Sequence, residues 1–102
     1  MNYMEKELAE KLKGFWEEKI QEDMPVNELI IRKIAKHAVE HWELNRSTMK
    51  PQKVMESISF EYFPVNEDVD KASLWIFLEH ADISYYLENG ESYGSGGFIQ
   101  FD

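Results

Sequence analysis

The chain has 102 residues, no cysteine and a formal net charge of −9 at pH 7. The lack of cysteine excludes disulfides, thiol nucleophiles and metal sites built on cysteine. No apolar run reaches the roughly 18 residues of a membrane-spanning helix, and no signal-peptide pattern is present, so we expect a cytoplasmic protein. With 43% hydrophobic residues, we expect residues 1–102 to form a single acidic α+β domain.

The negative charge is concentrated in the second half of the chain. Residues 51–102 contain 2 lysines and 10 acidic residues, and no basic side chain follows Lys71. Such a field repels nucleic acids and anionic membranes and favours encounter with a basic protein surface. An acidic balance also increases solubility, so charge alone does not identify a partner.

The first half of the chain predicts two amphipathic helices. Residues 4–22 carry apolar side chains at steps of three and four, and a second stretch with this spacing reaches about residue 45. Asp23 or Asn27 can cap the second helix. The apolar positions are Met4, Leu8, Leu12, Phe15, Trp16 and Ile20 in the first helix and Ile30, Ile31, Ile34, Ala35, Ala38 and Trp42 in the second.

The second half predicts strands. We expect residues 45–52, which include Pro51, to form a connection, and residues 54–62 to form a strand in which Ile58, Phe60 and Tyr62 alternate with polar residues.

Residues 68–88 fit either two strands joined at His80-Ala81 or one helix. Asn89-Gly90 is a hairpin turn in the first case and a helix cap in the second. We favour strands because the segment is rich in aromatic residues and isoleucine. A loop at Gly94, Gly96 and Gly97 is then followed by a last strand over residues 98–101.

These elements predict an α+β fold. Its two N-terminal amphipathic helices pack on one face of a small antiparallel sheet of three or four strands. The alternative is a mainly helical protein in which residues 68–88 form a third helix.

Two patterns suggest metal ligands. His37 and His41 belong to an H-x-x-E-H sequence, which places two histidines and a glutamate on one helix as in some zinc peptidases. No third ligand accompanies them, so packing against the neighbouring Trp42 is the alternative role. Asn66, Asp68 and Asp70 have the spacing of a calcium loop, but Lys71 stands where such a loop needs glycine.

No catalytic motif can be completed from the sequence. The glycine-rich segment near Gly94 lacks the following lysine and helix of a phosphate-binding loop. Ser92 lies in a G-x-S-x-G sequence, residues 90–94, but no helix is expected after it to form the nucleophile elbow of a hydrolase. We therefore predict a protein without enzymatic activity and without a metal or other cofactor. If a metal does bind, His37 and His41 are the candidate ligands.

The most specific surface prediction concerns residues 75–86. In the strand interpretation, Leu74, Ile76 and Leu78 face the core and the alternate residues face away from it; in the helix interpretation, positions 75, 79, 82 and 86 still share one face. Aromatic rings beside carboxylates can bind the Arg and Lys side chains of a partner. The predicted partner-binding residues are Trp75, Phe77, Glu79, Asp82, Tyr86, Glu88 and Glu91.

These features predict a protein that occupies a basic site on another protein, such as a nucleic-acid enzyme or a toxin. Small acidic phage inhibitors, some of which imitate the phosphate row of DNA, and bacterial immunity proteins have a similar size and charge. Direct nucleic-acid or membrane binding is not expected. The alternatives are a homodimeric assembly protein, whose second copy covers the aromatic face, and a small metal-dependent enzyme that uses His37, Glu40, His41 and His80.

Overall fold

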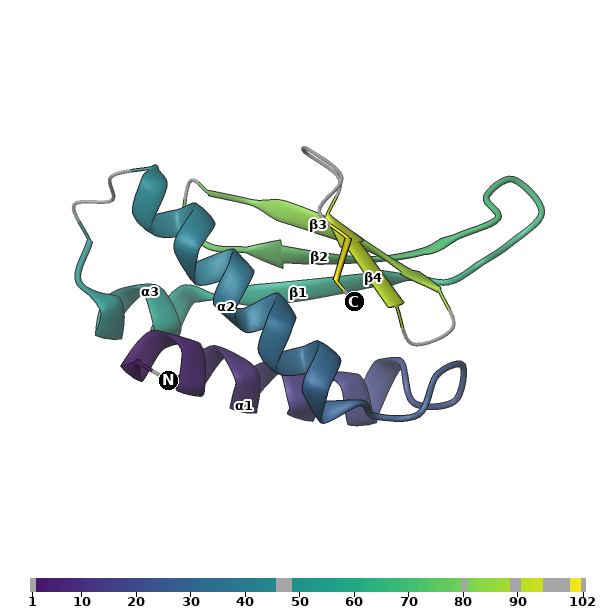
Figure 1. Ribbon diagram of the computed structural model, residues 1–102, viewed down its shortest axis with the longest axis horizontal. Helices are drawn as coiled ribbons and strands as arrows, with labels where there is room; N and C mark the ends of the chain where they lie inside the picture. The colour runs from purple at the N-terminus through teal and green to yellow at the C-terminus, as the bar shows by residue number, and fades with distance from the viewer. Residues whose placement is uncertain (1, 46–48, 80, 89–90, 95–99, 102) are drawn as a thin grey trace.

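The computed structural model describes residues 2–45, 49–79, 81–88, 91–94 and 100–101. It has two layers, an antiparallel sheet and a layer of helices that covers one of its faces (Figure 1). The predicted α+β class is confirmed, and the mainly helical alternative is wrong.

Two long helices form the helical layer. They are α1, Tyr3–Lys19, and α2, Glu28–Leu44. Asn2 and Asn27 cap them, since each side-chain oxygen accepts a hydrogen bond from a first-turn amide, that of Glu5 at 2.8 Å and that of Ile30 at 3.1 Å. Of the two caps considered for the second helix, Asn27 is therefore correct. The Trp16 indole closes the connection by donating to the carbonyl of Met24 at 2.9 Å.

A third helix replaces part of the predicted connection and strand. Residues Pro51–Ser57 form α3, and the strand begins only at Ser59. Proline is favoured in the first turn of a helix because its missing N–H would have no partner there. Helical geometry brings Val54 and Met55 into the core together, whereas a strand would place these adjacent residues on opposite faces.

The sheet is an antiparallel meander of five strands in chain order. Its strands are β1, Ser59–Phe63; β2, Ala72–Phe77; β3, Ile83–Glu88; β4, Glu91–Gly94; and β5, Gln100–Phe101. It has one strand more than expected, because Gly94 belongs to β4 and pairs with Tyr85 instead of opening a loop. His80, the Asn89-Gly90 turn, Gly96, Gly97 and Phe98 lie outside the described residues.

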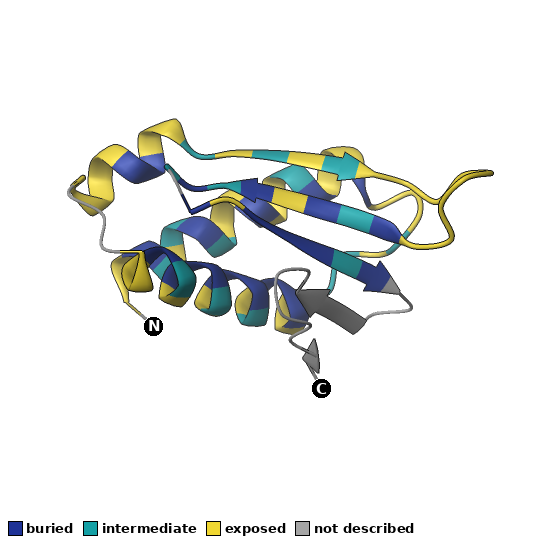
Figure 2. Cartoon of the chain, turned by 90° about the horizontal axis from the view of Figure 1, so that it is seen from above, coloured by how far each residue is buried: buried dark blue, intermediate teal, exposed yellow. Residues whose placement is uncertain are grey.

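The core lies between the helices and one face of the sheet. Alternate residues of β2 and β3, including Leu74, Ile76 and Tyr85, are fully buried, as are Leu8 and Ile34 of the helices. These residues belong to one continuous cluster. Figure 2 shows the buried side of the helices turned toward the strands.

Truncation of a core leucine should destabilise the protein far more than truncation of a surface leucine on the other helix. Leu8 is fully buried and Leu29 is 59% exposed. We expect Leu8→Ala to lower the free energy of unfolding by about 2–5 kcal/mol because it leaves a cavity. Leu29→Ala should change it by less than about 0.5 kcal/mol. Urea denaturation followed by circular dichroism measures both, and equal losses would contradict this core.

Candidate binding surface

The sheet has a second face that α1 and α2 do not cover. We call it the open face; Figure 2 looks onto the sheet from this side. Trp75 lies opposite Glu61 on one side and opposite Ser84 on the other, which fixes the rows of the face. Strand alternation and this register assign to it Ser59, Glu61, Phe63, Ser73, Trp75, Phe77, Ser84 and Tyr86.

A pair of aromatic rings occupies the middle of the open face. The rings of Trp75 and Phe77 are stacked, with centroids 6.1 Å apart and planes at 15°. Trp75 is 37% exposed, whereas Trp16 and Trp42 belong to the core at 2% and 7%. Phe63, on the neighbouring strand, is 46% exposed. The open face therefore presents aromatic surface that the helices leave uncovered.

The β1–β2 loop, residues 64–71, forms a wall beside these rings. Between the loop and the sheet lies an open hollow of about 740 Å³. Its floor contains Phe63, Trp75 and Tyr86 from the sheet, and its wall contains Asp68 and Asp70 from the loop. Lys71 also lines it, so the hollow combines aromatic rings and carboxylates with one lysine among the lining residues that the structure describes.

The acidic loop has a defined turn. The side-chain oxygen of Asn66 accepts hydrogen bonds from the amides of Asp68 at 2.7 Å and Val69 at 3.1 Å. The backbone amide of Asn66 in turn donates to the backbone carbonyl of Val69 at 3.1 Å. This Asx-type turn explains the Asn-x-Asp spacing without a cation, because the side-chain oxygen of Asn66 already accepts hydrogen bonds from two backbone amides.

Three of the predicted partner-binding residues, Trp75, Phe77 and Tyr86, lie on the open face. Asp82 is exposed between the buried Ala81 and Ile83, just before β3 begins, and lies outside the register that defines the face. For Glu88 and Glu91, the structure describes the backbone, which pairs them across β3 and β4.

Glu79 does not lie on the open face, contrary to the sequence prediction. It adopts a left-handed backbone conformation with φ 53°, in a turn where the amide of Ala81 donates to the carbonyl of Leu78 at 2.7 Å. The strand alternation that would place Glu79 beside Trp75 therefore ends before it. Its carboxylate instead accepts a 2.9 Å hydrogen bond from the indole of Trp42, on α2.

His37 contacts the core through one of its ring nitrogens. Its Nδ1 lies 2.8 Å from the hydroxyl of the fully buried Tyr85, and the two rings meet edge to face. Burial, with a smaller effect of His41, lowers the pKa of His37 from 6.5. Within the described part of the chain, no group of three His, Cys, Asp or Glu residues is placed to hold a metal ion.

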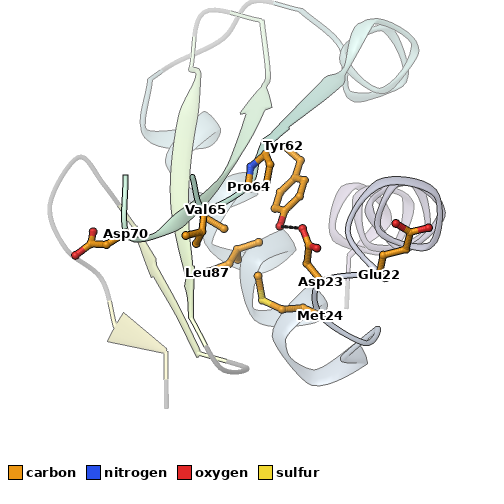
Figure 3. A pocket seen from close by; sticks show the side chains of 9 residues that line it. Glu22, Asp23, Met24, Tyr62, Pro64, Val65, Asp70 and Leu87 are labelled. Carbon is orange, nitrogen blue, oxygen red and sulfur yellow. Dashed lines mark hydrogen bonds between the residues drawn. The ribbon is translucent and has the colours of Figure 1, made fainter. Parts of the chain in front are cut away.

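A second hollow, of about 620 Å³, lies where the α1–α2 connection meets the sheet (Figure 3). In it the Tyr62 hydroxyl donates to a carboxylate oxygen of Asp23 at 2.7 Å. Burial and this bond raise the pKa of Tyr62 above its usual range, which keeps the hydroxyl protonated. Glu22 and Asp70 also line the hollow but point away from Asp23 (Figure 3), so the acids do not converge on one ligand.

The structure adds residues that the sequence prediction missed. Phe63, Asp68 and Asp70 join Trp75 in the first hollow. Glu61 was recognisable as a polar residue of its strand, since it alternates with Phe60 and Tyr62. No local signal could show that the loop carrying Asp68 stands beside a ring seven residues further along the chain.

Removal of the Glu79 carboxylate should destabilise the protein. Glu79→Ala takes an acceptor from the buried Trp42 indole, and we expect a loss of about 1–3 kcal/mol in the free energy of unfolding. Glu79→Gln, which retains a side-chain oxygen, should lose less. Asp82→Ala removes an exposed acid close by and serves as the control. Chemical denaturation that gave equal values for Glu79→Ala and Asp82→Ala would contradict the bond.

Protonation of His37 should weaken the fold. Because its pKa is lower in the folded chain, the unfolded chain binds more protons once the pH falls below about 6.5. The stabilisation that neutral His37 gives to the folded chain is thus present above that pH and is lost as the pH falls below it. The free energy of unfolding should fall more steeply from about pH 7.5 to 5.5 in the wild type than in His37→Gln. His41→Gln should keep most of the decline; identical slopes in all three proteins would exclude this role.

Within the described residues, no helix is long and apolar enough to cross a membrane. Comparisons with protein-family models, curated proteins and solved structures gave no match. The function of the protein must therefore be inferred from the chemistry of its own surface.

Proposed function

We propose that the protein binds a basic surface of another protein through the open face of its sheet. The observation that carries the proposal is the exposed Trp75, stacked on the half-buried Phe77, beside a hollow walled by Asp68 and Asp70. This combination is matched by arginine and lysine side chains, which contact aromatic faces and pair with carboxylates at the same time.

An arginine suits the hollow better than a lysine. A planar guanidinium can stack on the Trp75 ring while its N–H groups point to a carboxylate, whereas a lysine ammonium is a compact, strongly hydrated charge. The Trp75 face is partly desolvated by Phe77, which strengthens a cation–π contact relative to a fully exposed ring. We therefore expect an arginine to be the central contact of the partner.

The charge of the whole chain supports a basic partner over a second copy. The net charge of −9 attracts a basic protein over several ångströms and repels an identical chain. The acids near the rings, Glu61, Asp68 and Asp70, add to this field on the open face. Association with the partner should accordingly be fast and sensitive to salt.

The class of target that we favour is a protein that itself binds nucleic acid. Such proteins present rows of arginine and lysine spaced for phosphates, and residues on one face of a strand recur at roughly 7 Å, a similar spacing. An inhibitor of this kind blocks the site by occupying it and needs no catalysis. Neutralisation of a basic toxin by an immunity protein would use the same chemistry.

A defined cationic peptide tests the open face. We expect nona-arginine to bind with a change in tryptophan fluorescence, because Trp75 is the exposed indole, and nona-lysine to bind more weakly. Trp75→Ala removes this signal, so calorimetric titration compares the affinities. The variant should bind nona-arginine about tenfold more weakly, which corresponds to a cation–π contact of about 1.4 kcal/mol. Leu29→Ala, an exposed apolar truncation on α2, is the matched control.

Paired variants test whether binding depends on where the acidic residues lie or only on how many there are. The double variant Asp68→Asn, Asp70→Asn and the double variant Glu40→Gln, Glu43→Gln remove the same charge, the first beside the hollow and the second on exposed positions of α2. We expect the first to weaken binding clearly more than the second. Equal effects of the two, together with unchanged binding by Trp75→Ala, would rule out the open face as the site.

A further inference from the structure

Strand β1 leaves one long edge of the sheet unpaired. It lies at the end of the strand order and pairs only with β2, whereas the opposite edge is the two-residue β5. Figure 2 shows no further described strand beyond its outer side, where part of a helix is visible behind the sheet. In an antiparallel pair, every second residue turns its backbone N–H and C=O away from the neighbour. β1 therefore presents backbone donors and acceptors to its surroundings.

The outer groups of β1 have no hydrogen-bond partner within the described residues. Apart from the pairing with β2, the bond that involves Ser59–Phe63 there is the one from the Tyr62 hydroxyl to Asp23. Natural sheets protect such edges with proline, lysine, bulges or very short strands. β1 has five residues in regular register and contains neither proline nor lysine; Pro64 follows its end.

We propose that the outer edge of β1 accepts an extended basic segment of the partner as an additional antiparallel strand. This inference rests on the proposed function, because an added strand continues the open face. Backbone hydrogen bonds would supply affinity, and alternate side chains of the segment would supply specificity. The side chains on the open side would lie next to Glu61 and Phe63, one strand away from Trp75.

The surroundings of β1 define the sequence of the segment. On the open side, Glu61 is exposed at the centre of the strand, so the residue opposite it should be arginine or lysine. On the helix side, Phe60 and Tyr62 are half-buried, and Phe60 packs on Phe15 of α1 with centroids 5.3 Å apart. Apolar side chains suit that row. The segment should therefore alternate basic and apolar residues.

Charge distinguishes this occupant from a second copy of the chain. Pairing two β1 strands antiparallel with the open faces on one side places each Glu61 opposite Glu61, Ser59 or Phe63 of the other copy. Both carboxylates then share one small area between two chains of net charge −9. Like charges opposite each other destabilise strand pairs, whereas opposite charges stabilise them.

The experiment uses a nine-residue peptide of alternating arginine and valine with the full chain, followed by amide hydrogen exchange in NMR spectra. Alternate amides of β1 should exchange at least about tenfold more slowly when the peptide is bound. The same peptide with N-methylated amides keeps its charge but cannot donate to a strand, so it should bind much more weakly. A peptide of alternating glutamate and valine should not bind.

The outcomes separate this inference from the proposed function. If Trp75→Ala weakens binding but β1 amides are not slowed, the open face binds cations and strand addition is wrong. If β1 amides are slowed and Trp75→Ala binds normally, strand addition stands and the role of the open face fails. Equal binding of the N-methylated peptide would overturn strand addition. A dimer in light scattering whose β1 amides are already slow would assign the edge to a second copy.

Discussion

The burial of one sheet face by two helices is the constraint on which the rest of this structure depends. α1 and α2 have enough apolar surface to cover the side of the sheet that carries Leu74, Ile76 and Tyr85, and they cover no more. The other side of the same strands faces away from the helices, and it carries Ser73, Glu61 and the buried Ser84 together with the stacked rings of Trp75 and Phe77. The candidate surface is thus a consequence of how the core is built.

Two polar contacts fix α2 on the sheet. The Trp42 indole donates to Glu79 at one end, and His37 meets the hydroxyl of Tyr85 further along the helix. Buried polar groups are costly without partners, so these bonds favour one orientation of the helix over others that would bury similar apolar area. They also engage Nδ1 of His37 and a carboxylate oxygen of Glu79 within the fold. Residues that look chemical in the sequence here stabilise the fold.

The open face and the β1 edge are two parts of one continuous surface. A partner strand beside β1 would place its side chains in the row next to Phe63, which also lines the hollow under the acidic loop. Backbone pairing, aromatic contact and ion pairing would then act on the same segment. Such a combination gives specificity that a diffuse negative field lacks, because each contribution requires its own geometry.

The sequence by itself determined the two helices and, once residues 68–88 are taken as strands, the alternation that points Trp75 away from Leu74, because these follow from side-chain periods of 3.6 and 2. The choice between strands and a helix for residues 68–88 was a preference from composition that the tertiary structure decided. Tertiary structure decided the rest. It made Pro51–Ser57 a helix because Val54 and Met55 can then be buried together, and it turned Glu79 toward Trp42 because the chain reverses there. It also brought Asp68 beside Trp75, since a loop's position depends on contacts between residues distant in sequence, which local periodicity does not encode.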